Sequence, residues 1–377
     1  MTDRERFLKA LQTNVPSIDG KQLVIWGMGN TARLYQEGLR RLEKEGFCIS
    51  AYCDSRIKEG QVGEQAALFY GKPAISPEKL REMEQVCVLV CTPTPGLIAE
   101  IGRELDAMQL EWHLLDEVIL KLHADQVIAC YDRMADEKSR QVYEDVVMAH
   151  IHGTYLQEKA DSLADAYFAL EPFSAEDAGE AFVDCGAWIG DTVERYIWRR
   201  GGMFQKIVAF EPDAGNYAAM QKRLERLNGE WNFAEGKITA YPFGVSDTSA
   251  AMAFESYQDG LGSKFVGGGK NPSGEGVCRA VALDSFLTEP YSFLKADIES
   301  YEYRMLLGAK NGIRKWKPKI AACIYHNAVD LYEIPLLIHE IEKNYQFAVR
   351  HHSRTLAETV LYCWTEEKGE ARDIYEA

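Results

Sequence analysis

The sequence has no C-x-x-C pair, although it contains nine cysteines. Zinc ribbons and dithiol redox sites use such pairs, so neither kind of site is supported. Most of the cysteines lie in apolar runs, such as Cys87 and Cys91 in VCVLVC, and we interpret them as reduced, buried thiols. The chain also lacks an apolar run of the roughly 20 residues that a membrane-spanning helix needs. Its charged N-terminus, MTDRERFLKALQ, has no apolar signal region, so we expect a cytoplasmic protein without a membrane partner.

Positive charge is also in short supply. The chain has 42 lysines and arginines against 58 aspartates and glutamates, which gives a formal net charge of −16. Proteins that bind nucleic acid neutralise its phosphates with a basic stripe, and this sequence has none. We therefore expect no nucleic-acid partner, and a small-molecule substrate fits the charge better.

Apolar residues, in contrast, are abundant. They make up 46% of the 377 residues, which is enough for a core in each of two domains. In the first half, a strand over 23–26 runs into a glycine turn at Gly27 and Gly29. A helix over 31–45 then leads to a strand over 49–53, which ends at Asp54. This unit predicts parallel strands and a Rossmann-like domain over residues 1–120.

The second half repeats this pattern after a helical connector, which we predict over residues 121–178. A strand over 182–185 meets a turn with Gly186 and Gly190, and the next strand ends on Glu211. Strands and helices continue to alternate as far as two terminal strands, YQFAVRHHS and TVLYCW. The predicted fold class is therefore α/β, with two Rossmann-like domains. The C-terminal one, residues 179–377, is a doubly wound sheet that closes with an antiparallel strand.

Acids around the second glycine turn indicate what it binds. Such a turn lets the backbone approach a nucleotide, and Glu211 can accept both hydroxyls of a ribose. A dinucleotide brings a pyrophosphate, which carboxylates repel, whereas S-adenosylmethionine brings a sulfonium and an amino acid tail. Asp184 directly precedes the turn and Asp191 follows Gly190, so the methyl donor is favoured over NAD. Asp184 could accept from the ammonium of the tail or, alternatively, cap the amides of its own turn.

Several segments in order resemble the FkbM-type methyltransferase family: FVDCGAWIGDT, VAFEPD, GVSD, ALDSF, FLKADIESYEYRMLLGAK and PKIAACIYHNAVDLYEIPLLI. The resemblance covers about residues 135–365, since DEKSRQVYED and DAYF also look like the family. It implies a class I methyltransferase-type sheet with S-adenosylmethionine as cofactor. It also implies methylation of a hydroxyl on a sugar, a polysaccharide precursor or a similar small metabolite. Ser246 and Asp247, in GVSD, would contact the adenine. One departure is Ser300-Tyr301, where the family usually has a glycine after the second acid.

The catalytic residues are expected at the end of the fourth strand. The predicted set is Asp297, Glu299 and His326: Asp297 holds the acceptor hydroxyl, and either Asp297 or His326 takes its proton. A near-neutral pKa would suit His326 to that task, although it could also be a satisfied strand-end histidine. Glu302 could simply stabilise the start of a helix. We expect no metal, because a sulfonium donor needs none, and we expect acceptor specificity to lie in the loop 257–276 and in the helical lead-in.

The first glycine turn has two open interpretations. WGMGNTA, with Gly27, Gly29 and Asp54, fits a nucleotide or nucleotide-sugar site. The sequence equally allows a docking or dimerisation module, and with it a homodimer. The alternative function is an NAD(P)-linked or nucleotide-sugar-binding Rossmann protein that uses the methyltransferase-like domain for binding. Against an oxidoreductase, the first domain lacks a Ser-x-x-x-Tyr-x-x-x-Lys set.

Overall fold

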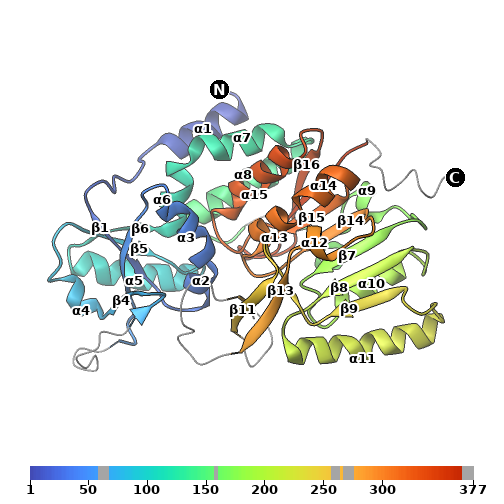
Figure 1. Ribbon diagram of the computed structural model, residues 1–377. Helices are drawn as coiled ribbons and strands as arrows, with labels where there is room; N and C mark the ends of the chain where they lie inside the picture. The colour runs from blue at the N-terminus through green and yellow to red at the C-terminus, as the bar shows by residue number, and fades with distance from the viewer. Residues whose placement is uncertain (58–67, 157–159, 256–263, 266–275, 367–377) are drawn as a thin grey trace.

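The computed structural model describes residues 1–57, 68–156, 160–255, 264–265 and 276–366. Figure 1 shows two main sheets side by side, the first in blue and teal and the second in green, yellow and orange. Most of the predicted specificity loop, 257–276, lies outside the described residues. Within the described residues, no helix is both long enough and apolar enough to cross a membrane.

The first sheet has the strand order β3-β4-β2-β1-β5-β6. Its strands are β1 (Gln22–Trp26), β2 (Ile49–Cys53), β3 (Leu68–Phe69), β4 (Lys72–Ile75), β5 (Val86–Val90) and β6 (Glu111–Leu114). All neighbours pair in parallel except β3 and β4, so the predicted Rossmann-like arrangement is confirmed. The helices between them are α2 (Asn30–Leu34), α3 (Gln36–Glu43), α4 (Pro77–Leu80) and α5 (Pro95–Ala107). The helix predicted over 31–45 is present as α2 and α3, which meet at Tyr35.

The second sheet has the order β16-β17-β15-β14-β7-β8-β9. Its strands are β7 (Ala181–Cys185), β8 (Lys206–Phe210), β9 (Ile238–Tyr241), β14 (Phe293–Ala296), β15 (Lys319–Cys323), β16 (Gln346–His351) and β17 (Thr359–Trp364). Strand β17 lies between β15 and β16 and pairs antiparallel with both, while the other pairs are parallel. The predicted doubly wound sheet with a terminal antiparallel strand is thus confirmed.

Helices and a small sheet complete the second half. The helices are α9 (Glu171–Ser174), α10 (Asp191–Arg199), α11 (Ala214–Trp231), α12 (Leu283–Phe286), α13 (Glu302–Gly308), α14 (Lys310–Trp316) and α15 (Asp330–Ile341), with a short 3-10 turn over Leu163–Asp165. The small sheet is formed by β10 (Gly244–Val245), β13 (Val277–Val281), β11 (Ala250–Glu255) and β12 (Lys264–Phe265), in that order. It follows β9 in the chain and lies beside the carboxyl ends of the main strands, so its residues can border a site there (Figure 1).

Four further helices join the two halves. They are α1 (Asp3–Gln12), α6 (Leu115–Leu122), α7 (Ala124–Arg133) and α8 (Glu137–His152). Helix α8 packs on α6 and on β16, and α7 packs on α15 (Figure 1). Phe7, Ile25, Val127 and Leu294 belong to one buried apolar cluster, although they come from α1, the first sheet, α7 and the second sheet. The core therefore continues from one sheet to the other. All the cysteines are free, and only Cys48 is exposed.

Candidate active site

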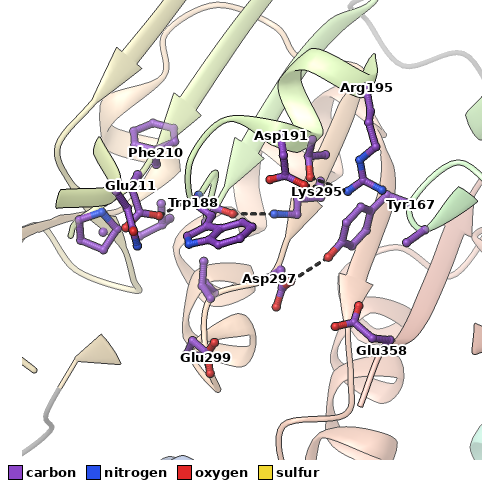
Figure 2. Close-up of a pocket in the computed structure, with 18 of the residues that line it drawn as sticks. Tyr167, Trp188, Asp191, Arg195, Phe210, Glu211, Lys295, Asp297, Glu299 and Glu358 are labelled. Carbon is purple, nitrogen blue, oxygen red and sulfur yellow. Dashed lines mark hydrogen bonds and ion pairs between the residues drawn. The ribbon is translucent and has the colours of Figure 1, made fainter. Parts of the chain in front are cut away.

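A cavity of about 550 Å³ opens where the parallel strands of the second sheet end. Ligands of open α/β sheets bind at this edge. Figure 2 shows side chains that converge on the cavity from several loops. The residues that line it include Tyr167, Gly186, Trp188, Asp191, Arg195, Phe210, Glu211, Phe243, Val245, Lys295, Asp297, Glu299, Tyr325 and Glu358.

The glycine turn after β7 brings the chain very close to β14. Gly186 has a φ of +79°, and a Cβ on it would lie 1.8 Å from the carbonyl oxygen of Asp297. No other residue fits there, so the contact fixes the turn against the end of β14. Gly190 has a φ of +78° and begins α10, and its missing Cβ gives Met220 room instead. Thus Gly186 lines the cavity, whereas Gly190 shapes the helix behind it.

Glu211 lies at the end of β8 with its carboxylate held by backbone amides. Its Oε2 accepts from the amide of Trp188 and its Oε1 from the amide of Asp213, both at 2.9 Å. Burial raises the pKa of Glu211 to about 7 despite these hydrogen bonds. Asp191 lines the same cavity at the start of α10, 3.3 Å from Arg195. Two of the predicted cofactor acids, Glu211 and Asp191, therefore face one cavity.

Asp184 supports the floor of the cavity and does not line it. Its carboxylate is fully buried, and its Oδ1 lies 2.9 Å from the Nζ of Lys295. Burial raises the pKa of Asp184 to about 6, so the group is a carboxylate at neutral pH. Burial alone would lower the pKa of Lys295, but Asp184 raises it above the usual value. Lys295 also donates to the carbonyl of Gly186 at 2.7 Å, so Asp184 holds a cation against the glycine turn.

Asp297 and His326 are in contact, as expected from the ends of neighbouring strands. The Nε2 of His326 lies 3.3 Å from Asp297 Oδ1, and its Nδ1 lies 3.3 Å from Glu302 Oε1. Glu299 is close by, with its Oε2 3.8 Å from His326 Nε2. The hydroxyl of Tyr167 donates to Asp297 Oδ2 at 2.8 Å. The predicted catalytic set is therefore brought together, with His326 buried behind the two acids that line the cavity.

The charges in this cluster differ from what we predicted. Burial would lower the pKa of His326, but Glu302, Asp297 and Glu299 raise it well above its usual value. Burial would likewise raise the pKa of Asp297, but the close contact with His326 and the charge of Lys295 lower it. The direction of the pKa of His326 thus differs from the near-neutral value expected, because carboxylates lie beside both ring nitrogens. The raised pKa favours the imidazolium form of His326, and the lowered pKa makes Asp297 a weak base.

Glu302 does more than begin a helix. It is fully buried, and its Oε1 accepts from the amide of Ile298 at 2.7 Å besides facing His326. Asp297, Glu302 and His326 also have potential metal-ligand atoms within 4.8 Å of one another. Between these two acids lies the imidazole of His326, 3.3 Å from an oxygen of each.

Glu358 is a site residue that the sequence analysis missed. It immediately precedes β17 with a φ of +69°, and its half-buried carboxylate enters the cavity near Asp297 and Tyr167 (Figure 2). Burial, and next the charge of Asp297, raise its pKa to about 7. No sequence motif marks Glu358. Tyr167, in contrast, lies in the DAYF segment of the helical lead-in, to which the family resemblance extends.

Ser246 and Asp247 do not line the cavity. The carboxylate of Asp247 lies 3.1 Å from Arg304, and the hydroxyl of Ser246 donates to Asp247 at 3.0 Å. Phe243 and Val245, just before them, do line it. The departure at Ser300 is accommodated by left-handed backbone, with φ of +56° at Glu299 and +74° at Ser300. The turn that a glycine would favour is therefore formed without one.

The first glycine turn has different surroundings. A Cβ on Gly27 would lie 2.7 Å from the carbonyl oxygen of Cys91, so this glycine allows β1 and β5 to end close together. Gly29 caps α2. Asp54 accepts from the amide of Met28 at 3.1 Å and forms a bidentate pair with Arg56, both bonds at 2.7 Å. The carboxylate of Asp54 is thus held by Arg56 in its own loop and by the amide of Met28 in the loop after β1.

The comparisons with known proteins concern the half of the chain that contains this cavity. Residues 184–354 match the family model of the methyltransferase FkbM domain. The structure of a methyltransferase FkbM from Methylobacillus flagellatus KT is similar to this one, with a TM-score of 0.56 and 22% identity over 97% of this chain and 94% of that chain. A putative rRNA-methylase from Clostridium thermocellum aligns with a TM-score of 0.33 and 12% identity, over 55% of this chain and 97% of that chain. No curated protein sequence matches the chain. Residues 184–354 therefore form a domain of the FkbM methyltransferase family.

Proposed function

We propose that this methyltransferase transfers the methyl group of S-adenosylmethionine to a hydroxyl oxygen of a sugar, a polysaccharide precursor or a similar small metabolite. The observation that carries this proposal is the single cavity that joins Glu211 at one end to Asp297 and Glu358 at the other. Its two ends differ in chemistry, as a nucleoside-linked donor and a hydroxyl acceptor require.

The donor set of the cavity fits S-adenosylmethionine. Glu211 can accept the ribose hydroxyls, and the apolar side chains of Phe210, Phe243 and Val245 offer a surface for the adenine. Asp191 can accept from the ammonium of the amino acid tail, while Arg195 can bind its carboxylate. When bound, S-adenosylmethionine supplies an electrophilic methyl group.

The acceptor end is suited to an alcohol. Asp297 can orient the acceptor hydroxyl by accepting a hydrogen bond, because its own orientation is fixed by Tyr167 and His326. Glu358 can take the proton of that hydroxyl, since its pKa is about 7. Such alignment is worth several kcal/mol, because a held acceptor reacts as part of one complex. Asp297, Glu299 and Glu358 together also favour an acceptor with several hydroxyl donors.

Binding of S-adenosylhomocysteine, measured by titration calorimetry, tests the cofactor assignment. The wild-type protein should bind it, and a Glu211→Gln variant should bind it about 10- to 150-fold more weakly, since hydrogen bonds to a charged group are worth about 1.5–3 kcal/mol. Glu225→Gln changes an exposed acid of α11 and should leave the affinity unchanged. Absence of binding to the wild-type protein would overturn the proposed function.

The acceptor class needs a second experiment. A panel of sugars and nucleotide sugars is incubated with S-adenosylmethionine labelled in its methyl group, and products are examined by NMR. We expect an O-methyl signal on at least one saccharide. A label found on nitrogen alone would contradict transfer to a hydroxyl.

A further inference from the structure

We propose that the N-terminal domain holds the His326 imidazole in place, through Tyr35 and Arg41. Tyr35 lies between α2 and α3, and Arg41 lies within α3. Neither residue lines the methyltransferase cavity. They reach instead the segment 326–330, which connects β15 to α15 and carries His326. They are positioning residues, because they act on the site only through this segment.

Tyr35 bonds to the backbone of the segment. Its side chain is buried, and its hydroxyl accepts from the amide of Ala328 at 3.0 Å. The same hydroxyl donates to Asp116, at the start of α6. A backbone amide two residues after His326 is therefore tied to two elements of the N-terminal half.

Arg41 bonds to a side chain of the segment. Its Nη2 donates to Asp330 Oδ1 at 3.0 Å, and its Nε donates to Glu333. Asp330 is fully buried, and its other oxygen accepts from the side chain of Asn327 at 2.6 Å. A buried carboxylate that loses its cation is strongly destabilised. Burial raises the pKa of Asp330 to about 7, and the charge of Arg41 opposes this rise, so Arg41 favours the carboxylate that holds Asn327, the residue next to His326.

Helix α3 also lies directly against the segment. A Cβ on Gly38 would come within 2.9 Å of Asn327 Oδ1 and 3.0 Å of Val329 Cγ2. Glycine inside a helix costs about 1 kcal/mol relative to alanine. Close packing against Asn327 and Val329 accounts for its presence here.

The segment in turn connects with the acids of the cavity. Asn327 donates to the hydroxyl of Ser300 at 3.4 Å, next to Glu299, while His326 faces Asp297 and Glu302. A shift of the segment would therefore move His326 away from the carboxylates that keep it protonated. The N-terminal domain contributes to the site in this way without touching a substrate.

The test is an NMR spectrum of the full-length protein, isotopically labelled at the histidine ring nitrogens. His326→Gln assigns the signal, which in the wild-type protein should show both nitrogens protonated at neutral pH. Tyr35→Phe and Arg41→Gln should each shift this signal towards neutral imidazole. Arg41→Lys, which retains a cation near Asp330, should shift it less.

Arg304→Gln provides the matched control. Arg304 also pairs with α3, through Glu37 at 2.7 Å, but it contacts Asp247 and not the segment 326–330. We expect this variant to leave the His326 signal where it is in the wild-type protein. An unchanged signal in both Tyr35→Phe and Arg41→Gln would overturn the proposal, as would an equal shift in Arg304→Gln. The NMR measurement uses neither S-adenosylmethionine nor an acceptor, so its result is independent of the proposed function.

Discussion

Among the carboxylates of the cavity, Glu358 is the best placed to accept a proton. Asp297 is surrounded by His326, Lys295 and Tyr167, and its lowered pKa makes it a weak base. Glu358 lacks such cations in direct contact among the described residues, and burial raises its pKa to about 7. We therefore assign proton removal to Glu358 and orientation of the acceptor to Asp297.

A Glu358→Gln variant tests this division of roles. General-base catalysis contributes about 10²- to 10⁴-fold, so kcat should fall by that factor while the affinity for S-adenosylhomocysteine stays the same. Glu235→Gln, which changes an exposed acid, should keep the wild-type kcat. A Glu358→Gln variant that retains wild-type turnover would rule out the assignment.

The pH dependence of the wild-type rate provides a separate measurement. A base must be deprotonated to act, and the pKa of Glu358 is raised to about 7. The rate should therefore rise with pH through about 7, and this inflection should be missing in Glu358→Gln. If both proteins show the same inflection, another group is responsible for it.

At the scale of elements, the turn after β7 and the end of β14 fix each other through Gly186. In a Gly186→Ala variant, the left-handed backbone should lower the free energy of unfolding by about 1–2 kcal/mol. The clash with Asp297 should lower it by about 1–3 kcal/mol more. Gly236→Ala is the matched control, because Gly236 has a φ of +78° and no atom within 4 Å of its Cβ position. Urea unfolding should therefore show a clearly larger loss for Gly186→Ala. Equal losses in the two variants would mean that the close approach is not what constrains the turn.

The strands around this turn could be predicted because they are short, buried and ended by glycine. The predicted strand over 182–185 corresponds to β7, and the one over 49–53 has the same bounds as β2. The helix predicted over 31–45 was less accurate, because the structure has α2 and α3, which meet at Tyr35. Local periodicity does not reveal such an interruption, because the apolar pattern of the sequence continues through it.

The site was predictable only in part, for a similar reason. Asp297, Glu299 and Glu211 end strands, and the ends of parallel strands meet at one edge of a sheet. Glu358 reaches that edge only because β17 inserts between β15 and β16, which no local pattern shows. The charge of His326 depends on Glu302, whose position beside the ring also follows from tertiary structure.

At the scale of the whole molecule, the two halves share a buried core and several buried polar contacts. The apolar cluster that contains Phe7 and Ile25 also contains Val183 and Leu294. Arg41 and Tyr35 extend this connection to the segment that carries His326. Domains joined by small polar interfaces move and unfold separately, but a shared apolar core couples their unfolding.

We therefore expect a single cooperative transition when the full chain is unfolded by heat in a calorimeter. S-adenosylhomocysteine at about 100 times its dissociation constant should stabilise the folded state by about 2.7 kcal/mol and move the whole transition upward. The ligand would bind only the second half, at Glu211, yet the first half would be protected equally because its core continues into β7 and β14. Tryptophan fluorescence can follow the halves separately, in variants that keep Trp26 of β1 or Trp364 of β17 as the sole reporter. Two transitions, of which the ligand moves only the one reported by Trp364, would show that the halves are thermodynamically independent.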